Sequence, residues 1–300
     1  MRYYQFTFDG HLHLGVEAAP GRIADLTAVS PHANSVLALL RAAEISGKGM
    51  DEIAGGLVKR AKGAAFTLAD LLVSSEKGRD PRLAPPIYAP EVWAAGVTYQ
   101  DSMRERQAES GTPDIYAKIY VADRPEVFFK ATAERIVPPF GKVGIRKDST
   151  WDVPEPELAF VIFGGKIVGY TSGNDMSSRS IEGANPLYLP QAKMYDRSCS
   201  IGPCFVTPET AGNPQKLRVV LRIERRGKEV FSGESNTAKM KRTCVEIADW
   251  LQRHNPVPDG TTVLTGTGTI PPPTFTLKAG DRVSVEIENI GTLVNTVTVV

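Results

Sequence analysis

Two glutamates separated by one residue, Glu155 and Glu157, begin an apolar run in the stretch WDVPEPELAFVIF. Pro154 and Pro156 lack a backbone donor and disfavour helix for the residue before each of them, so this segment is predicted to be extended. Side chains two residues apart on a strand leave the same face, so the two carboxylates can converge on one point. They repel each other unless a positive charge lies between them. An exposed acidic strand edge without a ligand is the other interpretation of such a pair.

A third acid and a lysine follow the pair. Asp175 stands in GYTSGNDMSSRS, which we interpret as a Gly-rich turn, and Lys193 ends the stretch GANPLYLPQAK. Carboxylate oxygens are the ligands that hard cations such as Mg²⁺ and Mn²⁺ prefer. A cation site made by Glu155, Glu157 and Asp175 is therefore one interpretation of the three acids, and an exposed acidic strand edge without a ligand stays open as the other. Lys193, taken alone, is also consistent with an exposed surface lysine, because most lysines are exposed.

Length and composition are those of a soluble globular protein. The chain has 300 residues and a formal net charge of +1, which gives no reason to expect nucleic acid or an anionic membrane as a partner. Its three cysteines lack the Cys-x-x-Cys spacing of zinc sites and cannot all pair, so reduced thiols in the cytoplasm are expected. The N-terminus has no signal-type apolar core, and no apolar run approaches the roughly 18 residues needed to span a membrane.

The first part of the chain is predicted to be a small α+β domain, residues 1–85. Asp9-Gly10 is a turn dipeptide between two strand-like runs. A helix is expected to begin at Ser30, with Pro31 at its first position, and a second helix is expected over residues 51–61. The proline-rich stretch DPRLAPPIYAPEVW then reads as a linker.

Residues 86–300 are predicted to be a larger, β-rich domain. Alternating apolar residues in LRVVLRIERRGKEVFSGE indicate a hairpin that turns at Arg226-Gly227. One helix begins at the capping box of Thr243 and Glu246. Residues 99–110 are polar and helix-tolerant, which is typical of a surface helix of the kind that covers binding sites. Together the two parts predict an α+β, β-rich fold with a mixed, curled sheet.

Residues 93–298 resemble the catalytic domain of the fumarylacetoacetate hydrolase family. The resemblance rests on five blocks in the family's order: PEPELA, GYTSGNDMSSRS, QAKMYDRSCSIGPCFV, VLTGTGTI and KAGDRVSVEIENIGTLVNTV. It implies a mixed β-sheet roll of the fumarylacetoacetate hydrolase type beside the small N-terminal α+β domain. It also implies a homo-oligomer, a homodimer or a homotetramer.

The resemblance assigns roles to residues that composition leaves open. It implies that Glu155, Glu157 and Asp175 bind Mg²⁺, for which Mn²⁺ or Ca²⁺ can substitute. Lys193 matches the family's active-site lysine. The substrate-binding positions that follow from the resemblance and from the covering helix are Ser102, Arg104, Lys130 and Thr267. Arg104 is equally consistent with a solvated surface charge, and Lys130 with a structural ion pair.

One departure from the family bears on the reaction. Hydrolase and decarboxylase members carry a His and a Glu three residues apart on the covering helix, where the pair orients a water molecule. Here the corresponding positions are Ser102 and Glu105. A serine of ordinary pKa cannot act as a general base at neutral pH, whereas Glu105 can still move a proton. The sequence therefore favours removal of water over addition of water.

Within the family the chain looks most like the dehydratases of 2-keto-3-deoxy-pentonates. That likeness implies Mg²⁺-dependent conversion of a 2-oxo sugar acid, such as 2-dehydro-3-deoxy-D-arabinonate, into 2,5-dioxopentanoate through an enolate that the cation stabilises. Lys193 removes the proton from carbon 3 or stabilises the enolate, and Glu105 protonates the departing hydroxyl. The alternatives are an acylpyruvate hydrolase, a 2-oxo acid decarboxylase of the oxaloacetate type, and a metal-dependent sugar-acid binding protein without turnover.

Overall fold

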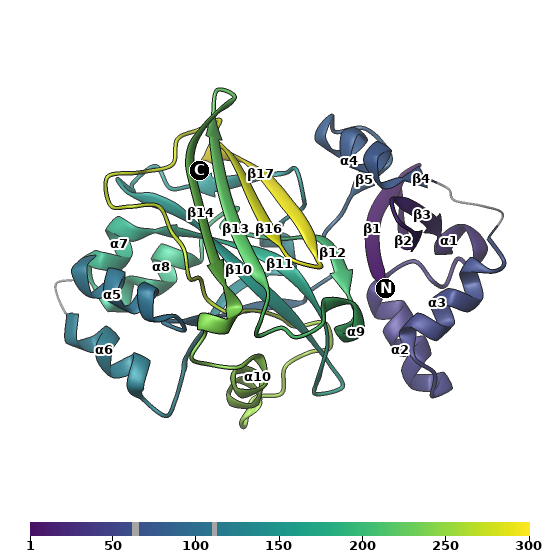
Figure 1. Ribbon diagram of the computed structural model, residues 1–300, viewed down its shortest axis with the longest axis horizontal. Coiled ribbons are helices and arrows are strands. Elements are labelled where there is room, and N and C mark those ends of the chain that lie inside the picture. Colours follow the sequence, from purple (N-terminus) through teal and green to yellow (C-terminus); the bar gives the residue numbers. More distant parts are fainter. Residues whose placement is uncertain (62–65, 110–112) are drawn as a thin grey trace.

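The structure is a computed structural model that describes residues 1–61, 66–109 and 113–300. The backbone alone is described for Ser102, Glu105, Arg106, Ala108, Glu109 and Pro113. The described residues form two sheets and several short helices (Figure 1). The α+β, β-rich fold expected from the sequence is confirmed.

The larger sheet has twelve strands in the described part of the chain. Its order is β4-β3-β2-β1-β12-β11-β10-β15-β6-β7, and β5 pairs with β1 while β8 pairs with β12. Its strands are β1 (Arg2–Phe8), β2 (His11–Ala19), β3 (Arg22–Asp25), β4 (Phe66–Thr67), β5 (Arg82–Leu83), β6 (Glu91–Gly96), β7 (Glu126–Thr132), β8 (Ile136–Val137), β10 (Asp152–Phe163), β11 (Lys166–Ser178), β12 (Cys199–Val206) and β15 (Thr262–Leu264).

A five-stranded sheet in the order β14-β13-β16-β17-β9 packs on the larger one. Its strands are β9 (Lys142–Ile145), β13 (Arg218–Arg225), β14 (Lys228–Asn236), β16 (Arg282–Ile287) and β17 (Gly291–Val299). The hairpin of β13 and β14 turns at Arg226 and Gly227, both with positive φ, as predicted.

The helices pack around the two sheets. They are α1 (Leu26–Val29), α2 (Val36–Ser46), α3 (Met50–Val58), α4 (Leu68–Glu76), α5 (Gln100–Glu109), α6 (Pro113–Val121), α7 (Arg179–Ala184), α8 (Leu189–Lys193), α9 (Pro208–Ala211) and α10 (Cys244–Gln252), with 3₁₀ turns at Ala133–Arg135, Pro186–Tyr188 and Thr237–Lys239. Figure 1 shows α5 to α8 together on one side of the molecule and the N-terminal elements on the opposite side.

Two details of the first helices differ from the prediction. The helix expected to begin at Ser30 and Pro31 begins at Val36, because Ser35 provides the N-cap and its hydroxyl accepts from the amide of Ala38. Ser30 instead ends the short helix α1.

The predicted helix at Thr243 is confirmed as α10, and the predicted hairpin at Asp9 and Gly10 is confirmed as β1 and β2.

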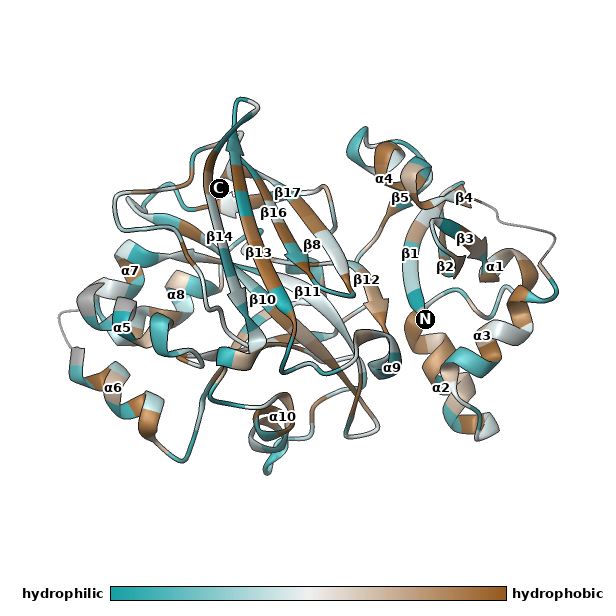
Figure 2. Cartoon of the chain, in the orientation of Figure 1, coloured by the Kyte–Doolittle hydropathy of each residue, from teal (hydrophilic) through white to brown (hydrophobic). Residues whose placement is uncertain are grey.

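Strand β10 lies in the centre of the fold and is buried along its whole length. Leu158, Phe160 and Ile162 belong to the apolar cluster that fills the space against the five-stranded sheet. Ala159 and Val161 belong to a second cluster on the opposite face of the strand. A strand covered on both faces reads as a continuous apolar run rather than an alternating one, and Figure 2 shows the brown, apolar stretch along it. Glu157 and Glu155 lie two and four residues before Ala159 on the same strand, so their side chains are on the face of Ala159. They therefore face away from the five-stranded sheet.

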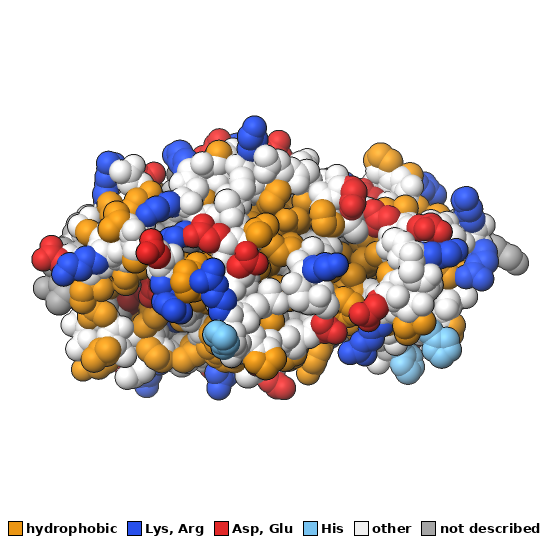
Figure 3. All heavy atoms as spheres, turned by 90° about the horizontal axis from the view of Figure 1, so that it is seen from below, with side chains coloured by type: hydrophobic (Ala, Val, Ile, Leu, Met, Phe, Trp, Pro, Cys, Tyr) orange, Lys and Arg blue, Asp and Glu red, His pale blue; other side chains and the backbone are white. Residues whose placement is uncertain are grey.

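Positively and negatively charged side chains are mixed on the surface, in agreement with the nearly balanced charge of the sequence. On the face seen in Figure 3, basic and acidic side chains are interspersed among apolar and neutral ones. Within the described residues, no helix is both long and apolar enough to pass through a membrane.

Candidate metal centre and active site

Strands β10 and β11 bring the three predicted acids together. The strands pair antiparallel, with Glu155 opposite Asp175 and Glu157 opposite Gly173. Asp175 therefore lies within a strand, and its predicted place in a Gly-rich turn is wrong. Gly173 serves close packing instead, since a Cβ atom there would lie 2.3 Å from Leu264. The chain turns earlier, at Gly164 and Gly165, which both have positive φ.

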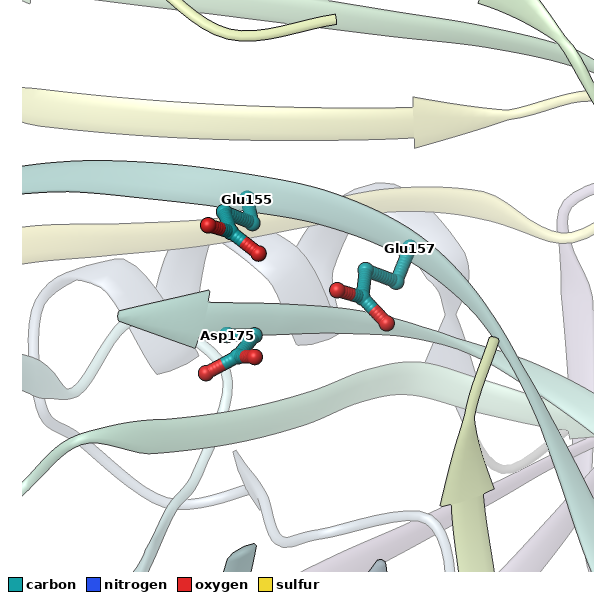
Figure 4. Close-up of side chains that lie close together, drawn as sticks. All are labelled: Glu155, Glu157 and Asp175. Atoms are coloured by element: carbon teal, nitrogen blue, oxygen red, sulfur yellow. The ribbon is translucent and has the colours of Figure 1, made fainter. Parts of the chain in front are cut away.

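The three carboxyl groups converge on one point (Figure 4). Each offers an oxygen atom that lies within 4.8 Å of the others. The exposed fractions are 3% for Glu155, 1% for Glu157 and 1% for Asp175, so water screens them poorly. Three negative groups at this distance in a buried place require positive charge among them.

Three cationic side chains supply part of that charge. The ammonium of Lys193 donates to Glu155 Oε2 at 2.9 Å and to Asp175 Oδ2 at 2.8 Å. Arg179 Nη2 donates to Glu155 Oε1 at 2.8 Å. Lys130, which is fully buried, forms an ion pair with Asp175 Oδ1 and donates to the carbonyls of Met176 and Lys193. The predicted Lys130 and Lys193 thus lie in the site.

Glu157 is the acid least compensated by direct contacts with cations. Burial raises its pKa well above the ordinary value, and the neighbouring carboxylates of Asp175 and Glu155 raise it further. Its Oε2 atom accepts from the amide of Gly266 at 2.6 Å. Gly266 has φ +88°, and a Cβ atom there would lie 2.0 Å from Thr98 Oγ1, so only glycine brings this amide so close.

The remaining predicted residues fall in different places. Thr267 is 4% exposed and lines the same pocket, although its hydroxyl donates to the carbonyl of Thr269. Arg104 is exposed on α5. Ser102 and Glu105 also belong to α5, but their side chains lie outside the described residues, so their roles remain predictions.

Other residues of the pocket were not predicted. Ser177 Oγ accepts from Lys193 at 2.5 Å, and its position two residues after Asp175 on a strand would have placed it on the same face. Glu182 on α7 and Glu126 on β7 also line the pocket. Glu126 lies on β7, the strand that also carries Lys130.

The described side chains fit a divalent cation. The carboxyl groups of Glu155, Glu157 and Asp175 are buried and their oxygens converge. The donor set of Glu155, Glu157 and Asp175 consists of carboxylate oxygens, which Mg²⁺, Mn²⁺ and Ca²⁺ prefer.

Comparison with known proteins gives a consistent picture. Residues 91–298 match the family described as "Fumarylacetoacetate (FAA) hydrolase C-terminal". A relative from Haloferax volcanii, named "Probable 2-keto-3-deoxyxylonate dehydratase", is 47% identical over 300 residues, which covers 100% of both chains. A relative from Saccharolobus solfataricus, named "2-dehydro-3-deoxy-D-arabinonate dehydratase", is 45% identical over 75% of this chain and 78% of its own length.

A solved structure shares the whole fold. It is titled "2-keto-3-deoxy-D-arabinonate dehydratase complexed with magnesium and 2,5-dioxopentanoate". Its TM-score is 0.83 at 34% identity, and the match covers 100% of this chain and 99% of that one. The mixed β-sheet architecture is therefore the one found in these dehydratases.

Proposed function

The chain belongs to the fumarylacetoacetate hydrolase family, and we propose that it is a hydro-lyase that dehydrates a 2-keto-3-deoxy-pentonate to 2,5-dioxopentanoate. The observation that carries this proposal is the full-length, 47% identity to a relative named as a dehydratase of such an acid. The solved dehydratase that holds magnesium and 2,5-dioxopentanoate supports it. The substrate class is a small 2-oxo sugar acid, for example 2-dehydro-3-deoxy-D-arabinonate.

The cofactor that fits is Mg²⁺, with Mn²⁺ or Ca²⁺ as substitutes. Glu155, Glu157 and Asp175 would hold it, since their oxygens converge and are buried. When bound, it supplies Lewis acidity toward the carboxylate and the 2-oxo group of the substrate, which makes the hydrogens on carbon 3 more acidic. Glu157 must be deprotonated to bind a cation, so its raised pKa makes cation binding compete with a proton.

The described residues suggest how the chain handles the proton of carbon 3. Lys193 lies beside Glu155 and Asp175, and Ser177 accepts its third hydrogen bond. As a neutral amine it removes the proton, and as an ammonium it stabilises the enolate. The ring centre of Phe128 lies 5.8 Å from the Lys193 ammonium. The reaction removes one proton from carbon 3 and the hydroxyl from carbon 4, and the resulting enone isomerises to the 5-aldehyde.

The product distinguishes the possible functions. The purified protein should be incubated with Mg²⁺ and 2-dehydro-3-deoxy-D-arabinonate, and 2,5-dioxopentanoate should be measured. We expect the aldehyde to form. Cleavage of an acylpyruvate or release of CO₂ from oxaloacetate, without this aldehyde, would mean a hydrolase or a decarboxylase instead. Binding of the sugar acid with no turnover of any of these compounds would mean a binding protein.

The cation requirement has its own test. Glu157→Gln keeps the shape of the side chain but removes one anionic ligand. We expect Mg²⁺ affinity, measured by calorimetry, to fall by at least about tenfold, since even indirect partners of a metal site contribute 10- to 100-fold. Removal of the cation with EDTA should abolish turnover, and added Mg²⁺ should restore it. Unchanged Mg²⁺ binding in Glu157→Gln would rule out this residue as a ligand.

We further propose a homodimer or homotetramer in the cytoplasm. Leu187 is 83% exposed and Tyr188 is 44% exposed, directly before α8, which is unusual for apolar side chains that no partner covers. The free, buried cysteines Cys199, Cys204 and Cys244 suit a reducing compartment. Light scattering on the purified protein would give the mass and decide the oligomeric state.

A further inference from the structure

Helix α8 carries two residues that line the pocket, one at each of its ends. Leu189 is its first residue and Lys193 its last, and both line the pocket together with the cation ligands Glu155 and Asp175. Residues four apart in a helix lie on the same face, with Cβ atoms about 5–6 Å apart. One wall of the pocket is therefore a single turn of helix, with a lysine at one end and an apolar side chain at the other.

This wall runs from the floor of the pocket toward its opening. Lys193 is 1% exposed, and its ammonium donates to Glu155 and Asp175. The carbonyl of Lys193 accepts from the ammonium of the fully buried Lys130, which fixes this end of α8. Leu189 is half-buried and so lies nearer the solvent. A substrate whose carboxylate and 2-oxo group bind at the cation ligands thus extends past Lys193 toward Leu189.

Distances along a carbon chain indicate which atoms meet Leu189. Lys193 acts on carbon 3, and carbon 5 lies about 2.5 Å beyond carbon 3 in an extended chain. A sixth carbon would lie about 4 Å beyond carbon 3. The Cβ atoms of Leu189 and Lys193 are about 5–6 Å apart, so a sixth carbon on this path comes within the ~4 Å at which apolar atoms are already in contact.

The pocket has little spare room around this path. The cavity among its described lining residues is about 10 Å³, which is room for about one water molecule. Closely packed side chains give way only at a cost in free energy. A bulky side chain at the end of the path therefore limits the length of the ligand.

We infer that Leu189 sets the length of the substrate chain, accepting five carbons and excluding a sixth. This inference rests on the proposed dehydration. Leu189 touches carbon 5 of the pentonate, whose hydroxyl points toward the opening, whereas a sixth carbon requires the leucine side chain to move. One methylene group more or less in an apolar pocket changes specificity by about 10- to 200-fold. Leu189 is thus a specificity-determining residue and takes no part in proton transfer.

The test compares two acids that differ by one CHOH group. They are 2-dehydro-3-deoxy-D-arabinonate and a six-carbon 2-keto-3-deoxy-hexonate of the same configuration at carbon 4, and the loss of each is followed by NMR in the presence of Mg²⁺. The wild type should prefer the five-carbon acid in kcat/KM by at least about tenfold. Leu189→Ala should reduce this preference by about tenfold or more, because kcat/KM for the six-carbon acid rises.

Matched variants separate the size of this side chain from the fold of the turn. Leu187→Ala makes the same truncation two residues earlier, at a side chain that is 83% exposed and outside the described lining of the pocket. It should keep the wild-type preference within about twofold, as surface substitutions do. Leu189→Met conserves the volume and should also keep the preference. Leu189→Val should lower it less than Leu189→Ala, and it provides the test if the alanine variant does not fold.

Three results would overturn the inference. The wild type could use both acids equally well, or Leu187→Ala could change the preference as much as Leu189→Ala does. Leu189→Ala could also lower kcat/KM for both acids in parallel and leave their ratio unchanged, which would make the leucine a structural residue. Failure of the proposed function is distinct, because the wild type would then dehydrate neither acid.

Discussion

The ammonium of Lys193 lies among the carboxylates of the site, where the negative charge would also stabilise a bound metal cation. Its ammonium lies between Glu155 and Asp175, at 2.9 Å and 2.8 Å from their oxygens, and it is 1% exposed. Without a metal ion it therefore acts as an internal counter-charge for the site.

Replacing Lys193 with methionine should expose the structural role. The substitution keeps most of the side-chain volume but leaves two buried carboxylates without this partner. We expect the free energy of unfolding in EDTA to fall by about 3 kcal/mol, as when one partner of a buried ion pair is removed. Mg²⁺ should then stabilise the variant more than it stabilises the wild type, as measured by thermal unfolding. Lys239→Met, at a lysine that is 58% exposed, is the control and should behave like the wild type in both conditions.

Asp152 should make stability depend on pH. Burial raises the pKa of Asp152 to about 6, and its Oδ1 atom has no hydrogen-bond partner among the described atoms. The folded state holds this proton more tightly than the unfolded state, so the contribution of Asp152 to stability is present at low pH. It is lost as the pH rises from about 4 to about 6. Asp152→Asn should therefore stabilise the protein at pH 7.5, by about 2 kcal/mol, and have little effect at pH 4.

Chemical unfolding at several pH values checks this expectation. The difference in free energy of unfolding between Asp152→Asn and the wild type should grow between pH 4 and pH 6 and then level off. An equal effect at all pH values would mean that the buried charge of Asp152 is not the cause.

Strand β7 brings Lys130 into the site through an irregularity in its pairing with β6. Val92 lies opposite Ala131 and Trp93 lies opposite Phe129, so Lys130 has no direct partner. Such a β-bulge redirects a side chain locally and is often found beside active sites. The bulge accounts for a fully buried lysine on a strand at the edge of the sheet.

The sequence was informative where local patterns decide the structure. The Asp9-Gly10 turn, the cap at Thr243 and the extended Glu155–Glu157 segment depend on neighbouring residues only, and all three were predicted correctly. Asp175 was misplaced because glycine in a strand and glycine in a turn look alike in a sequence. Only the packing of Leu264 against Gly173 distinguishes the two.

Helix α6 is held at its C-terminal end by cations from another part of the chain. Arg242 donates to the carbonyls of Ala122 and Asp123, and Lys241 donates to the carbonyl of Tyr120. These carbonyls have no partner within the helix, so cationic donors stabilise its end. The amide of Lys241 also donates to the carbonyl of Thr98, just before α5. One short segment therefore anchors the beginning and the end of the α5–α6 pair.

Removing this anchor should loosen α6 selectively. Arg242→Ala deletes two charged hydrogen bonds to the end of α6, each of which contributes about 1.5–3 kcal/mol, and also the ion pair with Glu246 on α10. We expect amide hydrogen exchange in residues 113–121 to accelerate by at least about tenfold, which corresponds to about 1.4 kcal/mol. Exchange in β10 and β11 should be unchanged. Arg222→Ala, which breaks an exposed ion pair with Glu286, is the control and should leave α6 unaffected. Equal acceleration throughout the protein would indicate global destabilisation instead.

The molecule is joined across the predicted boundary between its two parts. The division at residue 85 remains a prediction, but the strands on its two sides belong to one sheet. β1 pairs with β12 through Arg2 opposite Val206 and Tyr3 opposite Phe205. Tyr3 and Phe205 are fully buried, and their ring centres lie 6.3 Å apart. β12 in turn pairs with β11, which carries Asp175. The N-terminal strands therefore cover an edge of the sheet that holds the site.

We therefore expect the whole chain to unfold in one cooperative step. All three tryptophans, Trp93, Trp151 and Trp250, lie after residue 85, so their fluorescence reports on the larger part alone. Amide exchange in residues 2–19 reports on the N-terminal strands. The two signals should show the same midpoint in guanidinium chloride, because opening β1 exposes the buried edge of β12. Exchange of residues 2–19 at a clearly lower guanidinium concentration, with unchanged tryptophan fluorescence, would mean that the two parts are separate folding units despite their shared sheet.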